Sequence, residues 1–387
     1  MSDPVPTTLG QIDEAWLTSA LVSAGTVSPG TEIAEVVQER LGEGQGFMGE
    51  IARLRLSYGS GSGPPSLVAK VPTGDESNRA TGRSLGLYER EVRAYDSLLK
   101  TVDVPHPRAH VALYQSRGDE EQNLAQLMKA ERLPLWLLRR LARREQTDGD
   151  VPPCVLVLDD LDMYAMGDQL VGCDENRAAS VLSVAARLHG STWGDQCPPE
   201  RHWLVGGDVV PRLFHAVYLD NRVSLEQRVK PVFRPAVFEL TRSVRRSGLR
   251  RIRTLHQRTP RCLLHGDFRL DNLFFDEPGR VASVIDWQSV NRGPGVLDVA
   301  YFLTGSIEPS TPESVIDDLL AHYHADLIAA GVADYDLSQL RVDYDEALLL
   351  LLHRMSGLNA LEFGDDRGAE LIDTWLRRMD ARLARIT

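Results

Sequence analysis

Leu263-Leu264-His265-Gly266-Asp267-Phe268-Arg269-Leu270-Asp271-Asn272 is the stretch of this 387-residue sequence that decides its fold, and Val284-Ile285-Asp286-Trp287 follows it closely. The stretch places Asp267 five residues before Asn272, and Asp286 stands fourteen residues further along. Both aspartates lie in an apolar setting, where an unpaired carboxylate would be costly. The spacing therefore indicates a site that uses its carboxylates chemically.

The three polar residues have the chemistry that phosphoryl transfer requires. Moving the terminal phosphoryl group of ATP to a hydroxyl needs a carboxylate that orients the hydroxyl and takes its proton, together with oxygen ligands that hold magnesium on the phosphates. Asp267 fits the first task, and Asn272 and Asp286 fit the second. We expect the apolar run 281–286 to be a buried strand that delivers Asp286 from its end, paired as a hairpin with residues 273–275.

A chance Asp-Asn turn beside a buried histidine is the structural alternative, because Asp and Asn favour turns. Chance would have to supply His-Gly-Asp, the asparagine and Ile-Asp-Trp together at the right distances. The functional interpretation is therefore preferred.

These residues resemble the aminoglycoside phosphotransferase and choline kinase-like superfamily, whose fold is that of the protein kinases. The hallmark His-Gly-Asp-x-x-x-x-Asn stands at 265–272, and Ile-Asp-Trp stands at 285–287. The later Gly293-Pro294 and the run 298–302 also match, and the sequence Asp-Trp-Gln at 286–288 leans toward the ecdysteroid-kinase-like branch.

The resemblance implies roles for individual residues. Asp267 would be the catalytic base, and Asn272 and Asp286 would bind magnesium. His265 would be a structural residue of the loop, and Asp298 would hold this catalytic loop from the start of a helix.

Arg269 departs from the superfamily pattern, which often has histidine at that position. Protein kinases place a lysine there, against the transferred phosphoryl group. We therefore assign Arg269 the task of neutralising charge in the transition state. A solvated surface arginine is the other interpretation, since the chain is rich in arginine.

The fold that we predict is an α+β, two-lobe, protein-kinase-like fold. A small N-terminal nucleotide-binding lobe, 1–158, would have an antiparallel sheet, and a large, mainly helical lobe, 159–387, would carry catalysis and substrate binding. The residues expected in the sheet are 33–41, 51–58, 66–71, 111–114 and 155–158, and helical periodicity marks 12–24, 177–190, 312–330, 343–361 and 369–386.

Two segments, one in the small lobe and one at the hinge between the lobes, are expected to bind the nucleotide through their backbones. Gly44 and Gly46 lie in a glycine-rich turn between two predicted strands, where backbone N–H groups could close over phosphates. Asp160 and Leu161 follow the last strand and resemble the hinge of the superfamily, whose backbone bonds adenine. The turn alone is weak support, because there is no Gly-Lys-Ser or Gly-Lys-Thr of a P-loop.

Lys70 is one of only four lysines among 43 basic residues, so its place after the glycine-rich hairpin invites a specific explanation. Its strand resembles the third strand of kinase-like folds, where a lysine reaches the α- and β-phosphates and pairs with a glutamate of the next helix. Glu91 and Glu89 are the candidates for that glutamate, and Glu91 suits the Arg-Glu-x-x-x-Tyr pattern better.

An insertion at 116–150 lies before the hinge and is placed on the small lobe. Its run Leu135-Trp136-Leu137-Leu138 is set among arginines and predicts a helix or helical hairpin with a basic face. Three interpretations stay open: a helix packed on its own lobe, a homodimer contact, or a lid over the substrate.

Composition excludes several classes. The net charge of −12 disfavours nucleic acid as a partner and is compatible with a cationic small substrate. No run of 18 apolar residues exists, and the first residues do not have a signal-peptide pattern, so we expect a cytoplasmic protein that does not bind membranes. The four cysteines have no Cys-x-x-Cys spacing and are expected to be reduced.

The sequence thus predicts a phosphotransferase that uses ATP or GTP with Mg²⁺ and a small-molecule hydroxyl acceptor, such as an aminoglycoside, an amino alcohol or a sugar. A nucleotide-binding pseudokinase without turnover is one alternative. A metal-dependent hydrolase that uses His265 is another, although the next histidine, His256, stands at no recognised spacing.

Overall fold

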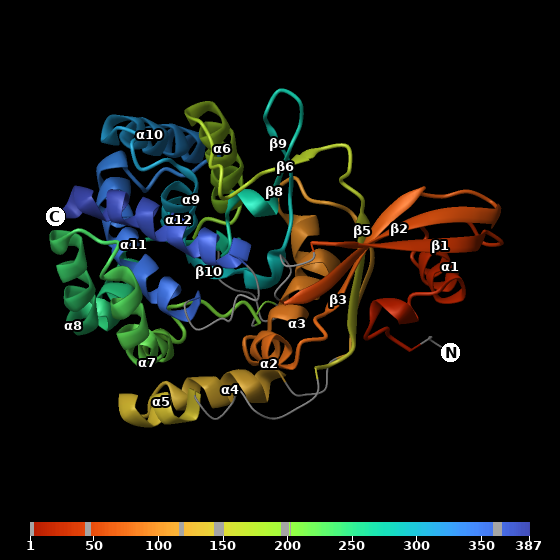
Figure 1. Ribbon diagram of the computed structural model, residues 1–387, viewed down its shortest axis with the longest axis horizontal. Helices are drawn as coiled ribbons and strands as arrows, with labels where there is room; N and C mark the ends of the chain where they lie inside the picture. The colour runs from red at the N-terminus through yellow and green to blue at the C-terminus, as the bar shows by residue number, and fades with distance from the viewer. Residues whose placement is uncertain are drawn as a thin grey trace. The chain divides into compact units, whose positions relative to one another are not determined.

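The computed structural model describes residues 4–42, 48–115, 120–142, 151–194, 201, 203–358 and 366–387. The chain has the predicted α+β, two-lobe fold, with an antiparallel sheet in its N-terminal part and a helical C-terminal part (Figure 1). It divides into two compact units. Unit 1 comprises Met1–Thr101, His106–Gly118 and Glu145–Met163, and unit 2 comprises Val102–Pro105, Asp119–Arg144 and Tyr164–Thr387.

The sheet of unit 1 has five strands in the order β1-β2-β3-β5-β4, with every neighbouring pair antiparallel. The first three strands form a meander. Alternating apolar residues of the sheet, among them Leu54 and Val157, are fully buried on one face. The strands are β1 (Glu32–Leu41), β2 (Gly49–Ser60), β3 (Ser66–Pro72), β4 (Ala109–Tyr114) and β5 (Cys154–Asp159).

Helix α1 (Glu14–Ser23) covers the buried face of this sheet with Leu17 and Leu21 (Figure 1). The helix begins where the Asp13 side chain accepts the backbone N–H of Trp16 at 2.8 Å, which satisfies one of the donors left unpaired at a helix start. Helices α2 (Glu76–Ser84) and α3 (Leu87–Arg93) follow β3, and α3 continues as a π-helical turn over Ala94–Leu98.

Two small sheets in unit 2 carry the decisive stretch of sequence. Strand β7 (Arg261–Leu264) pairs with β10 (Asn291–Pro294). Strand β8 (Leu273–Phe275) pairs with β9 (Val281–Val284), which confirms the predicted hairpin, and β6 (Ala165–Met166) joins the other edge of β8.

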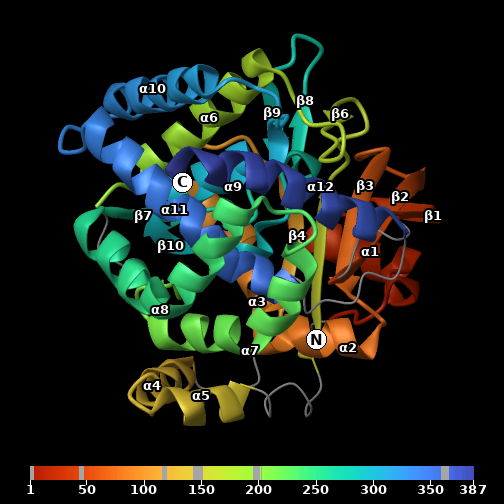
Figure 2. The ribbon, with the colours of Figure 1, turned by 60° about the vertical axis from the view of Figure 1, so that its left-hand side comes forward.

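The rest of unit 2 is helical. Helix α9 (Val296–Ser306) is buried along its whole length and forms the centre of this unit (Figure 2). No helix in the described ranges is long and apolar enough to cross a membrane. The other helices are α4 (Glu120–Ala130), α5 (Leu135–Ala142), α6 (Glu175–Gly190), α7 (Pro211–Val229), α8 (Pro235–Arg258), α10 (Glu313–Ala329), α11 (Leu337–Leu358) and α12 (Asp366–Leu383).

Helices α4 and α5 of the insertion lie beside α7 (Figures 1 and 2). The Glu131 carboxylate accepts the backbone N–H groups of Arg212 at 3.1 Å and Leu213 at 2.7 Å, at the start of α7, where the helix dipole favours negative charge. Arg139 of α5 donates to Asp220 of α7. Residues 119–144 therefore group with unit 2, which corrects the expected placement of the insertion 116–150 on the small lobe. The domain boundary near Leu158 stays a prediction.

The apolar run of α5 divides into a buried and an exposed part. Leu138 is 1% exposed, whereas Trp136 is 66% exposed. We expect Leu138→Ala to lower the free energy of unfolding by about 2–3 kcal/mol, because it leaves a cavity under α5. Trp136→Ala on the same helix should change it by less than about 0.5 kcal/mol. Chemical denaturation of both variants tests this, and an equal loss in both would contradict the packing of α5 described here.

Candidate functional site

The loop after β7 is fixed by a carboxylate of α9. Asp298 accepts the backbone N–H groups of His265 at 2.7 Å and Gly266 at 3.0 Å, as the resemblance implied. Gly266 has a φ of 78°, and a side chain there would collide with the carbonyl oxygen of Ser289, so the turn requires glycine. The chain consequently leaves β7 along one defined path and presents Asp267.

His265 is fully buried and uses both ring nitrogens on the backbone of this loop. Its Nε2 lies 2.9 Å from the carbonyl oxygen of Ile285, to which it must donate, and its Nδ1 accepts the N–H of Asp267 at 3.2 Å. Its ring packs edge-on against Trp287 with the centroids 4.7 Å apart. The geometry suits a structural role, and neither nitrogen remains for a metal ion.

Donors from three helical or turn elements surround the Asp267 carboxylate. Its Oδ1 accepts the Tyr301 hydroxyl at 2.8 Å and Nη2 of Arg354 at 2.7 Å. Its Oδ2 accepts Nδ2 of Asn272 at 3.1 Å and lies 3.4 Å from Nε of Arg269. Tyr301 belongs to α9 and Arg354 to α11, so elements distant in sequence orient this side chain.

The charges around Asp267 keep it ionised. Burial by itself raises the pKa of the carboxyl group, but the positive charges of Arg269 and Arg354 outweigh burial and lower that pKa to about 2. Burial likewise acts to lower the pKa of Arg269, yet the facing carboxylates, Asp267 first among them, raise it. Near neutral pH the site therefore holds a carboxylate that can accept a proton, beside a permanent cation.

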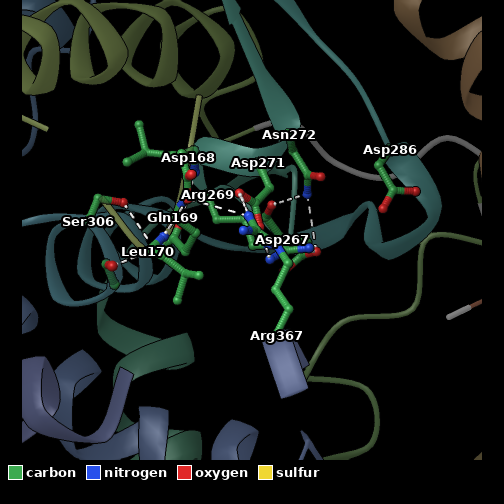
Figure 3. Close-up of polar contacts among 12 residues, drawn as sticks. Asp168, Gln169, Leu170, Asp267, Arg269, Asp271, Asn272, Asp286, Ser306 and Arg367 are labelled. Carbon is green, nitrogen blue, oxygen red and sulfur yellow. Dashed lines mark hydrogen bonds and ion pairs between the residues drawn. The ribbon is translucent and has the colours of Figure 1, made fainter. Parts of the chain in front are cut away.

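Arg269 is not a solvated surface residue, because its side chain is only 19% exposed. Besides Asp267, it contacts Asp271 through Nη1 at 2.7 Å. The structure thus brings the predicted base and the predicted charge-neutralising cation together, as Figure 3 shows.

The predicted metal ligands follow the base on neighbouring segments. Asn272 ends a 3-10 turn, Leu270–Asn272, and its Nδ2 also donates to the backbone oxygen of Asp267 at 2.8 Å. The N–H of Ile285 donates to the Asn272 backbone oxygen at 3.0 Å and so ties Asp286 to this turn. In Figure 3 the side-chain oxygen of Asn272 points toward the side on which Asp286 lies.

Asp286 is strained. Among the described residues it is the only non-glycine residue with positive φ, at 65°, a conformation that costs energy for a residue with a side chain. Its Oδ2 accepts Nε2 of Gln288 at 3.1 Å. Such strain is typical of functional positions, where the surrounding structure imposes it.

Asn272 and Asp286 together supply the kind of oxygen ligands that magnesium takes. Magnesium is commonly held by one or two protein carboxylates together with waters and substrate phosphates. In the part of the chain that the structure describes, no group of three or more His, Cys, Asp or Glu residues could hold a metal ion by itself. The donor set therefore fits a cation that a nucleotide would help to bind.

In unit 1 the structure brings Lys70 to Glu91 and not to Glu89. Lys70 Nζ lies 2.7 Å from Glu91 Oε1, and the side chains are 15% and 6% exposed. Glu89 instead pairs with Arg93 at 2.8 Å and accepts the Tyr114 hydroxyl at 3.1 Å. Lys70 comes from β3, an inner strand, and Glu91 from α3.

The remaining predicted nucleotide contacts are only partly described. Asp160 pairs with Arg53 at 2.7 Å and accepts the Ser66 hydroxyl, so its carboxylate is engaged within unit 1. The hinge assignment of Asp160 and Leu161 concerned their backbone and stays a prediction. Gly44 and Gly46 lie outside the described residues.

Sequence reasoning missed three residues around the loop: Tyr301, Arg354 and Gln169. Tyr301 stood within the matching run 298–302, but no role was assigned to it. Gln169 is fully buried. Its side-chain Oε1 accepts the backbone N–H of Leu270 at 2.8 Å, and its backbone N–H donates to Oδ1 of Asp271 at 2.8 Å (Figure 3). No local motif marks Gln169 or Arg354, so only the folded chain identifies them.

Comparisons with known proteins identify the family of the chain. The sequence model of a family described as "Phosphotransferase enzyme family" matches residues 79–337. That range includes Glu91, Asp267 and Asp286 and leaves out Lys70. No curated protein sequence matches the chain.

Solved structures resemble the whole chain at low sequence identity. A putative aminoglycoside phosphotransferase from Ralstonia eutropha aligns with a TM-score of 0.52 at 15% identity, covering 95% of this chain and 98% of that one, which shows the shared fold. A macrolide 2'-phosphotransferase type I aligns at 0.47 and 16% identity over 98% and 99% of the two chains. An aminoglycoside phosphotransferase from Streptomyces rimosus aligns at 0.43 and 17% identity over 88% and 98%.

Proposed function

The chain belongs to the phosphotransferase enzyme family, and from this premise we propose that it transfers the terminal phosphoryl group of ATP, or of GTP, to a hydroxyl of a small molecule. One observation carries the proposal: Asp267 is held as a carboxylate against Arg269 and Asn272, on the loop that Asp286 adjoins. A proton acceptor, a cation and two oxygen ligands are the parts that this reaction needs. Acceptors of the kinds named above, an aminoglycoside, an amino alcohol or a sugar, fall within the proposal.

The proposed mechanism is in-line displacement. Asp267 orients the acceptor hydroxyl and takes its proton while the hydroxyl oxygen bonds to the γ-phosphorus and the bond to the leaving nucleoside diphosphate breaks. Arg269 offsets charge that develops on the transferred group. Asn272 and Asp286 would hold magnesium, which supplies further neutralisation of the phosphates when bound. Lys70, held by Glu91, would grip the α- and β-phosphates.

Nucleotide turnover tests this function. Binding of Mg²⁺-ATP and Mg²⁺-GTP is measured first, followed by nucleotide consumption with a panel of alcohols and amino sugars. Consumption that depends on one acceptor supports the proposal. Binding without consumption across the panel would favour a pseudokinase, and tightly bound zinc would favour a hydrolase. The engagement of both His265 nitrogens already speaks against the hydrolase.

Asp286→Ala should weaken binding of the magnesium nucleotide itself. Even outer partners of metal ligands are worth about 10–100-fold in metal affinity, so removal of a ligand should cost at least as much. Titration calorimetry with Mg²⁺-ATP measures the loss. Asp276→Ala in the same β8–β9 hairpin is the control, because Asp276 pairs only with Arg280 and nearby backbone in the described structure. Equal affinity of the Asp286→Ala variant and the parent would remove Asp286 from the metal site.

Several narrower expectations stay predictions. They are membership of the ecdysteroid-kinase-like branch, the cytoplasmic location, and a homodimer or a substrate lid formed by the insertion.

A further inference from the structure

The two oxygens of the Asp267 carboxylate are held unequally. Oδ1 has two close donors, the Tyr301 hydroxyl at 2.8 Å and Arg354 at 2.7 Å. Oδ2 has longer contacts within the described structure, to Asn272 at 3.1 Å and to Arg269 at 3.4 Å. A carboxylate oxygen accepts about two hydrogen bonds. Oδ1 is therefore filled, whereas Oδ2 has one hydrogen bond, from Asn272, and a longer ion-pair contact to Arg269 within the described structure, so Oδ2 is the more easily approached.

Arg354 grips both the loop backbone and the base. One end of its guanidinium donates to the carbonyl oxygen of Gly266, and the other donates to Oδ1 of Asp267. A planar guanidinium suits such a two-point contact. The side chain reaches this position from α11 and is 32% exposed.

Tyr301 supports the same grip. The Arg354 guanidinium lies over the Tyr301 ring, 3.9 Å from its centroid, at a distance typical of a cation–π contact. The ring is in turn backed by Trp375 of α12, with centroids 4.6 Å apart, and both aromatic side chains are buried. Arg354 and Tyr301 thus form one rigid unit on Oδ1, which is called the Oδ1 clamp below.

We propose that the Oδ1 clamp is a positioning device for phosphoryl transfer: Arg354 and Tyr301 lock Oδ1 so that Oδ2 is the oxygen that receives the acceptor proton. This inference rests on the function proposed above. The terminal torsion of an aspartate is broad and nearly two-fold, so an unclamped carboxylate would rotate among several orientations. Asn272, a proposed metal ligand, contacts Oδ2, which places that oxygen on the side of the phosphates.

The step assigned to Oδ2 is a balanced transfer. The acceptor O–H proton moves to Oδ2, the acceptor oxygen forms a bond to the γ-phosphorus, and the bond from that phosphorus to the ADP oxygen breaks. With Mg²⁺-ATP alone, water takes the place of the acceptor and the products are ADP and phosphate. Hydrolysis therefore tests the clamp before the acceptor is identified.

Arg354→Ala is the main variant. It should lower kcat for Mg²⁺-ATP hydrolysis by about 10–10²-fold, since a misplaced catalytic group costs rates of this order, while the KM for Mg²⁺-ATP stays unchanged. Guanidinium chloride at millimolar concentration should restore much of the lost kcat, because the partly exposed Arg354 side chain leaves a space that solvent can reach. Sodium chloride at equal ionic strength should not restore the kcat of this variant. Arg354→Lys should stay impaired, because a single ammonium cannot span the carbonyl and the carboxylate.

Two further variants separate positioning from general damage. Arg341 lies on the same helix as Arg354 but pairs with Asp317 and not with Asp267. The Arg341→Ala variant should therefore leave kcat unchanged. Tyr301→Phe keeps the ring under Arg354 and loses only the hydroxyl donor. It should lower kcat by a smaller factor, and guanidinium should not restore it.

The outcomes distinguish the clamp from the function beneath it. An unchanged kcat in Arg354→Ala, or a loss that guanidinium does not reverse, overturns the clamp. If the parent hydrolyses Mg²⁺-ATP and Asp267→Asn does not, the proposed function stands whatever Arg354→Ala does. If the parent consumes no nucleotide, either alone or with any acceptor of the panel, or if Asp267→Asn turns over as fast as the parent, the proposed function itself fails.

Discussion

Asp267→Asn should lower phosphoryl transfer by at least about 10²-fold, the usual scale for a group that accepts a proton in the transition state. The asparagine side chain has almost the same shape, but it has no charge and cannot take the acceptor proton. Binding of Mg²⁺-ATP should stay close to that of the parent, because the proposed ligands Asn272 and Asp286 are unchanged. Initial rates at saturating nucleotide, together with calorimetric binding, separate the two effects.

The same variant should also be less stable, because it leaves Arg269 and Arg354 facing a neutral group. In the parent both guanidinium groups contact the Asp267 carboxylate, at 3.4 Å and 2.7 Å. Removal of one partner from a largely buried charge cluster typically costs a few kcal/mol, about 3–5 in the strongest cases. Rates are therefore compared at a temperature well below the Tm of the variant. Near-normal transfer by a folded Asp267→Asn variant would show that Asp267 is not the base.

The local part of the site could be predicted from sequence because its members are close in the chain. Asp267 and Asn272 share one turn, and Ile285 bonds the Asn272 backbone directly, so motif spacing was sufficient to group them with Asp286. The helices of the C-terminal region follow 3.6-residue periodicity, and the expected ranges 312–330, 343–361 and 369–386 overlap α10, α11 and α12.

The distant part could not be predicted in this way. Arg354 stands 87 residues after Asp267 and Tyr301 stands 34 after it, and contacts at such separations leave no local pattern. In a chain with few lysines, any arginine could serve as the second cation, so composition did not distinguish Arg354. The exposure of Arg269 was ambiguous for the same reason.

The insertion was misplaced for a different physical reason. It lies between β4 and β5 in sequence, and consecutive elements are usually neighbours in space, which favoured the small lobe. Two sets of polar contacts instead hold the insertion against α7: Glu131 caps the start of α7, and Arg139 pairs with Asp220 of α7. Neither contact follows from the position of the insertion before the hinge, on which its expected placement depended.

Lys70→Arg should lower kcat/KM for the nucleotide on the order of 10²-fold, as the loss of one preorganised charge-stabilising donor does. The substitution keeps the charge and changes its shape. Lys70 lies on an inner strand with its Nζ 2.7 Å from Glu91, and a Cβ added at the neighbouring Gly49 would stand only 3.0 Å from the Lys70 Cε. A planar guanidinium does not reproduce the position and shape of the compact ammonium there.

Glu91→Gln should reproduce much of this loss, because the lysine would then lose its ion pair with the Glu91 carboxylate. Lys100→Arg serves as the control in the same unit. The Lys100 side chain is 69% exposed, and its Nζ makes a long, solvated ion pair with Asp96 at 4.0 Å. Steady-state kinetics and calorimetric binding of Mg²⁺-ATP should show a raised KM and a weaker Kd for Lys70→Arg and parent-like values for Lys100→Arg. If Lys70→Arg instead matches the parent in both measurements, Lys70 does not bind the phosphates, and its pair with Glu91 serves only to join β3 to α3.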